Sequence, residues 1–138
     1  MTDNIRLICF DFDGTIADTM PWLEQNAVKL FIDYYKIDKE KAVHDYRMTT
    51  GLPFEHQVEM IFPENPLNTE VIESFEKRKM ERMHEQELFP ETKEVLSKLK
   101  DLGFLIAVSS STIKPIIEEY TTDKSIRQYL DDVVGFNG

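Results

Sequence analysis

Two aspartates that stand two residues apart, Asp11 and Asp13, have the clearest capacity for chemistry in this sequence. In an extended chain such residues point to the same side, with α-carbons roughly 7 Å apart. One carboxylate can then attack phosphorus, while the other gives a proton to the leaving oxygen and later takes one from water. The competing interpretation is an Asp-rich turn, in which both side chains merely bond nearby amides.

The residues around the pair favour chemistry over a simple turn. Gly14 lets the backbone turn tightly beneath the two acids. Thr15 could hold Asp13 through its hydroxyl, and the amides around Phe12 could face the oxygen atoms of a phosphate. We therefore predict Asp11 as the nucleophile and Asp13 as the general acid and base of a phosphoryl-transfer site.

The elements that must position these acids are predicted by the apolar patterns of the chain. Three apolar runs are expected to be buried strands: 5–10, 104–108 and a run that begins at Val133. Helices are expected between them at 90–102, at 115–120 and, capped by Asp123, shortly before the third strand. Strands that alternate with helices indicate a parallel α/β sheet with right-handed crossovers.

A run of hydroxyl side chains follows the second predicted strand. Because active sites in such sheets gather at the carboxyl ends of strands, Ser109 should lie near Asp11. The Ser109 hydroxyl and the Ser110 amide are therefore expected to bind phosphate. Ser111 and Thr112 are expected only to cap the next helix.

The long segment between the first strand and the rest of the sheet is expected to be helical. Its apolar residues recur at three- and four-residue spacing, with breaks at Gly51-Leu52-Pro53 and at 63–66. The helices are expected at 22–37, 39–48, 54–61 and 69–87. The predicted organisation is an α/β core at 1–16 and 89–138, with a helical bundle inserted at 17–88.

Composition narrows the partners that this chain can have. The net charge of −10 disfavours nucleic acid or an anionic membrane as a partner. The single cysteine, Cys9, lies in an apolar run, where a buried thiol is expected, and it suits a reducing cytoplasm. The first residues show neither a signal-peptide pattern nor a membrane span. We therefore expect a cytoplasmic protein.

The segment Leu7-Ile8-Cys9-Phe10-Asp11-Phe12-Asp13-Gly14-Thr15 resembles motif I of the haloacid dehalogenase superfamily. Ile106-Ala107-Val108-Ser109 resembles motif II, and 89–92 resembles the return to the core, although the family more often has Gly in place of Glu91. The layout is similar to that of phosphoglycolate phosphatases and beta-phosphoglucomutases. The resemblance implies a Rossmann-like core with a helical cap, a small phosphorylated metabolite as substrate, and Mg²⁺ bound by Asp11 and Asp13.

The resemblance also assigns a role to the break after the second bundle helix. In the family a loop at this place is lowered over the site to choose substrates, so Arg47, Thr50 and Gly51 could select an anionic substrate. A helix-ending turn with an exposed arginine explains the same residues equally well.

Two features of the family are expected beyond the third strand, a motif III lysine and motif IV acids, whereas this sequence ends at Gly138. We therefore expect a partial core that turns over poorly. It should self-associate through an exposed edge of the Asp11 strand, swap elements, or be a fragment of a longer folded protein. A phosphatase is the expected function. A phosphomutase of the same superfamily and a non-catalytic remnant or binding module are the alternatives.

Overall fold

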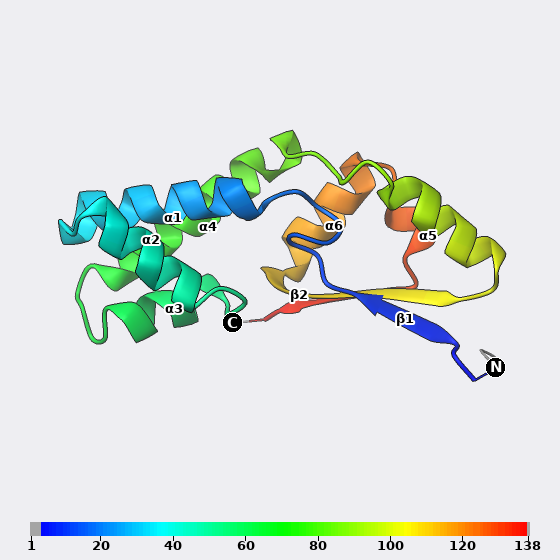
Figure 1. Cartoon of the computed structure of the whole chain (residues 1–138), viewed down its shortest axis with the longest axis horizontal. Helices are drawn as coiled ribbons and strands as arrows, with labels where there is room; N and C mark the ends of the chain where they lie inside the picture. The colour runs from blue at the N-terminus through cyan, green and yellow to red at the C-terminus, as the bar shows by residue number, and fades with distance from the viewer. Residues whose placement is uncertain (1–3, 138) are drawn as a thin grey trace. The chain divides into compact units, whose positions relative to one another are not determined.

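The computed structural model describes residues 4–137, which form two compact units. The helical unit comprises Met20–Arg82, and the core unit comprises the described residues on both sides of this insertion. Figure 1 follows the chain through the two units from blue to red. None of the described helices is both long enough and apolar enough to cross a membrane.

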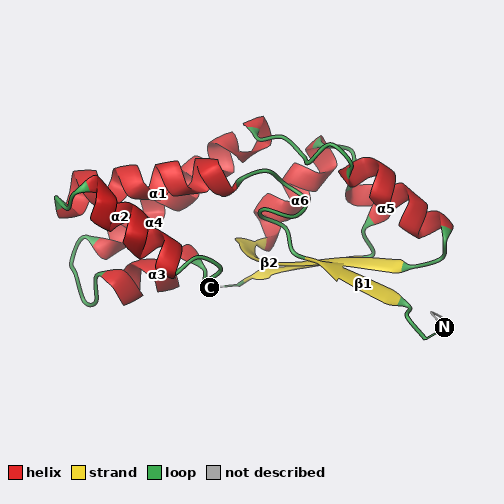
Figure 2. Ribbon diagram, in the orientation of Figure 1, coloured by secondary structure: helices red, strands yellow, loops and turns green. Residues whose placement is uncertain are grey.

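The core unit is built on a parallel sheet with the strand order β1-β2-β3. Its strands are β1 (Leu7–Phe10), β2 (Leu105–Ile113) and β3 (Asp132–Phe136). Two helices, α5 (Thr92–Asp101) and α6 (Lys114–Asp123), connect the strands and lie on the same side of the sheet (Figure 2). The predicted α/β fold with a parallel sheet is therefore confirmed.

The two faces of this sheet differ in their exposure. Ile106, Val108 and Val133 point to the helices and are buried, whereas Leu7 is 54% exposed and Cys9 is exposed. The expectation of a buried first strand and a buried thiol was wrong. Alternate residues of a strand point to opposite faces, and the core-unit helices α5 and α6 lie on one face only.

The second strand is longer than its apolar run indicated. It continues from Val108 through the serine run to Ile113, and its pairing with β3 shifts register between Ser109 and Ile113. Such an irregularity bends a strand and redirects its side chains. The predicted polar connection at 109–112 is therefore a strand extension.

The helix predicted after Asp123 does not form. Asp123 is the last residue of α6, and Ser125 has a φ of +61°, which interrupts the helical path. Only a short 3₁₀ turn follows, η2 (Arg127–Tyr129), before β3 begins. Ile126 and Leu130 are nevertheless buried, so the apolar pattern predicted their burial but not the length of the element.

The helical unit consists of α1 (Met20–Tyr35), α2 (Lys39–Met48), α3 (Phe54–Ile61) and α4 (Asn68–Arg82), and a 3₁₀ turn, η1 (Met83–Glu85), follows in the core unit. Its core is aromatic: Phe31 lies 5.2 Å from Phe62 and 6.1 Å from Phe54 between ring centroids. The Tyr35 hydroxyl donates a 2.6 Å hydrogen bond to the Asn68 side chain. These contacts join the first helix to the last two.

Candidate active site

Asp11 and Ser109 lie at the same level on neighbouring strands: Asp11 directly follows β1, and Ser109 lies within β2. Phe10 pairs with Val108 in the parallel ladder, and Asp11 and Ser109 are the residues that follow this pair in the chain. Both are exposed. The structure thus brings together the two residues that the sequence assigned to nucleophilic attack and phosphate binding.

The loop after β1 is folded back on one carbonyl group. The Phe12 carbonyl accepts hydrogen bonds from the amides of Thr15, Ile16 and Ala17, at 3.2, 2.9 and 3.1 Å. Gly14 has a φ of +79°, a region that favours glycine. The tight turn predicted at Gly14 is present and fixes the backbone between the two aspartates.

The Phe12 side chain anchors this loop in the core unit. It is completely buried and meets the Tyr120 ring edge to face, with 5.3 Å between centroids. The Tyr120 hydroxyl donates to the Gln86 carbonyl at 2.9 Å, and burial raises the pKa of Tyr120. The Phe12 amide donates to Oδ1 of Asp11 at 2.7 Å. Both the side chain and the backbone amide of Phe12 thus hold the loop in place.

The carboxylate of Asp13 is held by two threonine hydroxyls. Thr19 donates to Oδ1 at 2.6 Å, and Thr112 donates to Oδ2 at 2.7 Å. Both threonines are buried, at 0% and 2% exposure. Thr15 was expected to hold Asp13 but is exposed. The expectation of a threonine hydroxyl was right, but the residues that donate are Thr19 and Thr112.

Sequence reasoning missed Thr19 and Thr112 for different reasons. Thr19 follows a turn whose path could not be derived from spacing, and Thr112 is 99 residues from Asp13. Thr112 was expected to cap a helix, yet it lies within the extension of β2. The two-residue alternation that runs from Ile106 through Val108 and Ser110 to Thr112 was the available signal.

The second predicted phosphate-binding serine has a local partner. The Ser110 hydroxyl oxygen accepts a 3.0 Å hydrogen bond from the Thr112 amide. Ser109 has the β3 residue Val134 as its register partner. The two serines therefore differ, because the Ser110 hydroxyl supports the strand extension whereas Ser109 is exposed within β2.

Arg47, Thr50 and Gly51 belong to the helical unit. Arg47 donates to both carboxylate oxygens of Glu24, from Nε at 3.1 Å and from Nη2 at 2.9 Å, and this bonding raises the pKa of Arg47. The Thr50 hydroxyl donates to the Tyr46 carbonyl at 3.1 Å, and Gly51 has a φ of +102°. The arginine is thus an exposed cation with an acidic partner.

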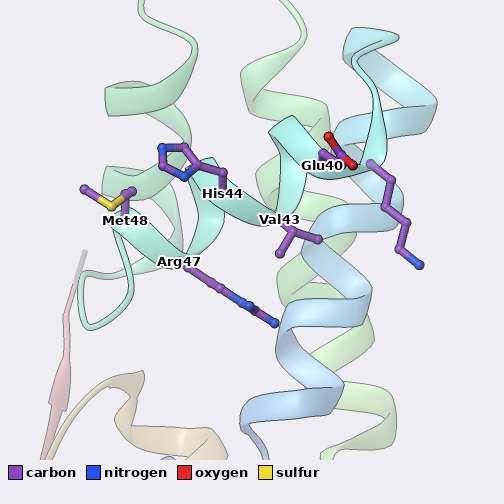
Figure 3. Close-up of a pocket in the computed structure, with 6 residues that line it drawn as sticks. Glu40, Val43, His44, Arg47 and Met48 are labelled. Atoms are coloured by element: carbon purple, nitrogen blue, oxygen red, sulfur yellow. The ribbon is translucent and has the colours of Figure 1, made fainter.

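Arg47 also borders an open pocket of about 490 Å³ on α2. In Figure 3 its side chain extends toward α1, whereas His44 and Met48 point the other way. The lining residues are Lys39, Glu40, Val43, His44, Arg47 and Met48. All of them come from one helix, so this hollow is a surface feature of the helical unit.

The donor chemistry at the end of β1 suits Mg²⁺. This ion prefers oxygen ligands and usually keeps several waters, with one or two carboxylates from the protein. The Asp11 carboxylate and the Asp13 main-chain carbonyl are oxygen donors of this kind, whereas both side-chain oxygens of Asp13 already accept hydrogen bonds. Residues 4–137 contain no group of three or more His, Cys, Asp or Glu side chains suited to a metal ion.

The chain is similar in sequence and in fold to known proteins. The chain is 25% identical over 149 residues to a phosphoglycolate phosphatase of Aliivibrio fischeri, covering 98% of this chain and 63% of that protein. A haloacid dehalogenase-like hydrolase from Bacteroides fragilis has the same fold, with a TM-score of 0.78 at 20% identity over 96% of this chain and 63% of that one.

A further solved structure shares the fold. CbbY from Rhodobacter sphaeroides, in complex with phosphate, has a TM-score of 0.73 at 21% identity, covering 96% of this chain and 64% of that one. The chain thus spans less than two thirds of the length of these relatives. A model of the haloacid dehalogenase-like hydrolases matches residues 8–137, and the chain therefore belongs to this family.

Proposed function

We propose that this protein is a Mg²⁺-dependent phosphatase that hydrolyses small phosphorylated metabolites through an aspartyl-phosphate intermediate. The observation that carries the proposal is the common level of Asp11 and Ser109, which directly follow the paired residues Phe10 and Val108. A carboxylate nucleophile and a hydroxyl donor at the same level of neighbouring strands suit one phosphoryl group. The name of the Aliivibrio fischeri relative, a phosphoglycolate phosphatase, supports the same reaction class.

In the proposed reaction the Asp11 carboxylate attacks phosphorus, and the bond from phosphorus to the ester oxygen breaks as the acyl phosphate forms. Asp13 donates a proton to that oxygen, so the product leaves as an alcohol. Water then attacks the phosphorus of the acyl phosphate and gives a proton to Asp13, which releases Asp11 and inorganic phosphate. The hydrogen bonds from Thr19 and Thr112 support Asp13 in both steps.

The phosphate oxygens are proposed to be bound by the Ser109 hydroxyl and by the amides of Ser110, Phe12 and Thr15. The Phe12 amide donates to Asp11 at 2.7 Å and the Thr15 amide to the Phe12 carbonyl at 3.2 Å. These two amides reach a phosphate only by exchanging their partners. Mg²⁺, held by Asp11 and the Asp13 carbonyl, would neutralise charge on the phosphate oxygens.

The helical unit is proposed to select the substrate through Arg47, Thr50 and Gly51. An arginine guanidinium recognises phosphate or carboxylate through a planar pair of N–H groups. Arg47 presents this pair to the Glu24 carboxylate, which shows that its fork can bind a planar oxygen pair. A small anionic metabolite of the reducing cytoplasm is the proposed substrate.

The decisive experiment measures phosphate release with Mg²⁺ from sugar phosphates, phosphoglycolate, nucleotides and an aryl phosphate. Asp11→Asn removes the nucleophile with little change in volume, so it should abolish release. Persistent turnover by the pure variant would reject the assignment. Isomerisation of a sugar phosphate without phosphate release would identify a phosphomutase. Phosphate binding without turnover by a version that spans the full length of the relatives would identify a binding module.

A further inference from the structure

We infer that Thr112 is a positioning residue for Asp13, placed there by the extension of β2. This inference rests on the proposed acid and base role of Asp13. The Thr112 hydroxyl donates to Oδ2 of Asp13 at 2.7 Å, and the threonine is 2% exposed. A hydroxyl buried this deeply against a carboxylate is a strong orienting contact, because leaving either group unpaired would be costly.

The hydroxyl type matters for a group that must gain and lose a proton. A hydroxyl donates to an ionised carboxylate and can turn to accept from a protonated one. An ammonium group in the same place could only donate and could not accept a hydrogen bond from the protonated form. Two hydroxyls, from Thr19 and Thr112, engage the two oxygens of Asp13 and stop the carboxyl group from rotating. The pair can therefore hold Asp13 in one orientation through the whole reaction cycle.

The position of Thr112 depends on two neighbouring residues. The Ser110 hydroxyl accepts a hydrogen bond from the Thr112 amide at 3.0 Å, which fixes the backbone of β2 just before Thr112. On the other side, Gly135 of β3 lies so close that a Cβ there would be 2.8 Å from the Thr112 carbonyl oxygen and 2.3 Å from the Lys114 nitrogen. Only a residue without a side chain allows β3 to approach Thr112 in this way.

The test uses the carboxyl ¹³C resonance of Asp13 in the full chain, assigned with Asp13→Asn. Thr112→Val keeps the shape but removes the hydroxyl, so we expect the resonance to move or broaden, and Thr112→Ser should restore it. Thr121→Val is the matched control, because Thr121 is equally buried but donates to the Ile117 carbonyl. Gly135→Ala keeps the hydroxyl but displaces Thr112, so it should also move the resonance.

Kinetics add a second measurement. Thr112→Val should lower kcat for alkyl phosphates by about tenfold, a part of the 10²–10⁴-fold that general acid catalysis contributes, and aryl phosphates should lose less. Thr112→Ser should recover most of this rate. An unchanged Asp13 resonance in Thr112→Val and in Gly135→Ala would overturn the inference. The resonance can be measured without turnover. It therefore tests the hydrogen bond from Thr112 to Asp13 even if the assay of Asp11→Asn rejects the proposed function.

Discussion

The Thr19 hydroxyl lies 2.6 Å from Oδ1 of Asp13, and Thr19 is the last residue of the core unit before the helical unit begins at Met20. The acid and base candidate is therefore bonded to the point at which the chain leaves the core unit. Because Thr19 is completely buried, the contact is shielded from competing water. The orientation of Asp13 is thus coupled to the path of the exit segment.

Asp13→Asn should slow the cleavage of alkyl phosphates by about 10²–10⁴-fold, because a poor leaving group needs a proton donor. Aryl phosphates, whose leaving groups are stable as anions, should be affected much less. The rates of phosphate release from one alkyl and one aryl substrate measure this difference. Asp33→Asn changes an exposed carboxylate of the helical unit and serves as the control. Equal slowing of both substrates would exclude Asp13 as the acid.

Arg47→Glu should raise KM for anionic substrates by roughly tenfold with little effect on kcat, because a charge-assisted bidentate contact would be lost. The control is Lys41→Glu, which makes the same charge change on the same helix, where Lys41 pairs with Asp45. Steady-state kinetics on both variants provide the comparison. If KM rises equally in the two variants, general electrostatics rather than Arg47 selects the substrate.

The uncovered face of the sheet should make this chain self-associate. Parallel sheets are normally covered on both faces, yet Leu7, Leu105 and Val134 are each at least 50% exposed. Burying one leucine stabilises by about 1.5–3 kcal/mol, so Leu7→Lys should weaken association by about tenfold or more. Light scattering after size-exclusion chromatography measures the mass.

Met80→Lys is the matched control for this experiment, because Met80 is an exposed apolar residue of the helical unit. It should leave the association unchanged. A wild-type chain that stays monomeric at all concentrations would contradict the prediction.

Part of this structure could be predicted from the sequence because its signals are local. The bounds expected for α2 and α3, 39–48 and 54–61, agree with the structure. Turn residues such as Gly51 and Pro53 end the helical pattern on both sides of the break. The proximity of Asp11 and Ser109 was likewise expected from their places after two apolar runs, and the register of β1 and β2 agrees with it.

The rest depends on contacts between distant residues. The serine run of β2 has little intrinsic strand preference, yet it is extended because it pairs with β3 and delivers Thr112 to Asp13. Burial of Leu7 and Cys9 was expected from their apolar neighbours, but alternation along a strand cannot tell which face of a sheet is covered. Tertiary context decided both outcomes.

The helical unit should lose stability in alkaline solution. Burial and the nearby charge of Glu59 raise the pKa of Tyr35 to about 12. Because the folded protein favours the neutral phenol, this contribution is fully present below the ordinary tyrosine pKa of about 10 and is lost as the pH rises towards about 12. Chemical denaturation across this window, followed by circular dichroism, measures the loss.

Tyr35→Phe supplies the control for the alkaline experiment. It keeps the ring that stacks on Phe62, at 3.6 Å between centroids, but removes the titrating hydroxyl and its bond to Asn68. The variant should be less stable at neutral pH and show a flatter decline. Parallel declines in both proteins would refute the role of Tyr35.

The segments that leave and re-enter the core unit are hydrogen-bonded to each other. The Asp18 amide donates to the Glu87 carbonyl at 2.9 Å, and the Phe89 amide donates to the Ile16 carbonyl at 3.1 Å. The ends of a long insertion are therefore closed by the core itself, and the entropy of loop closure grows only slowly with loop length. The arrangement makes the inserted unit modular, because its length can change at little cost to the hydrogen bonds that close its ends.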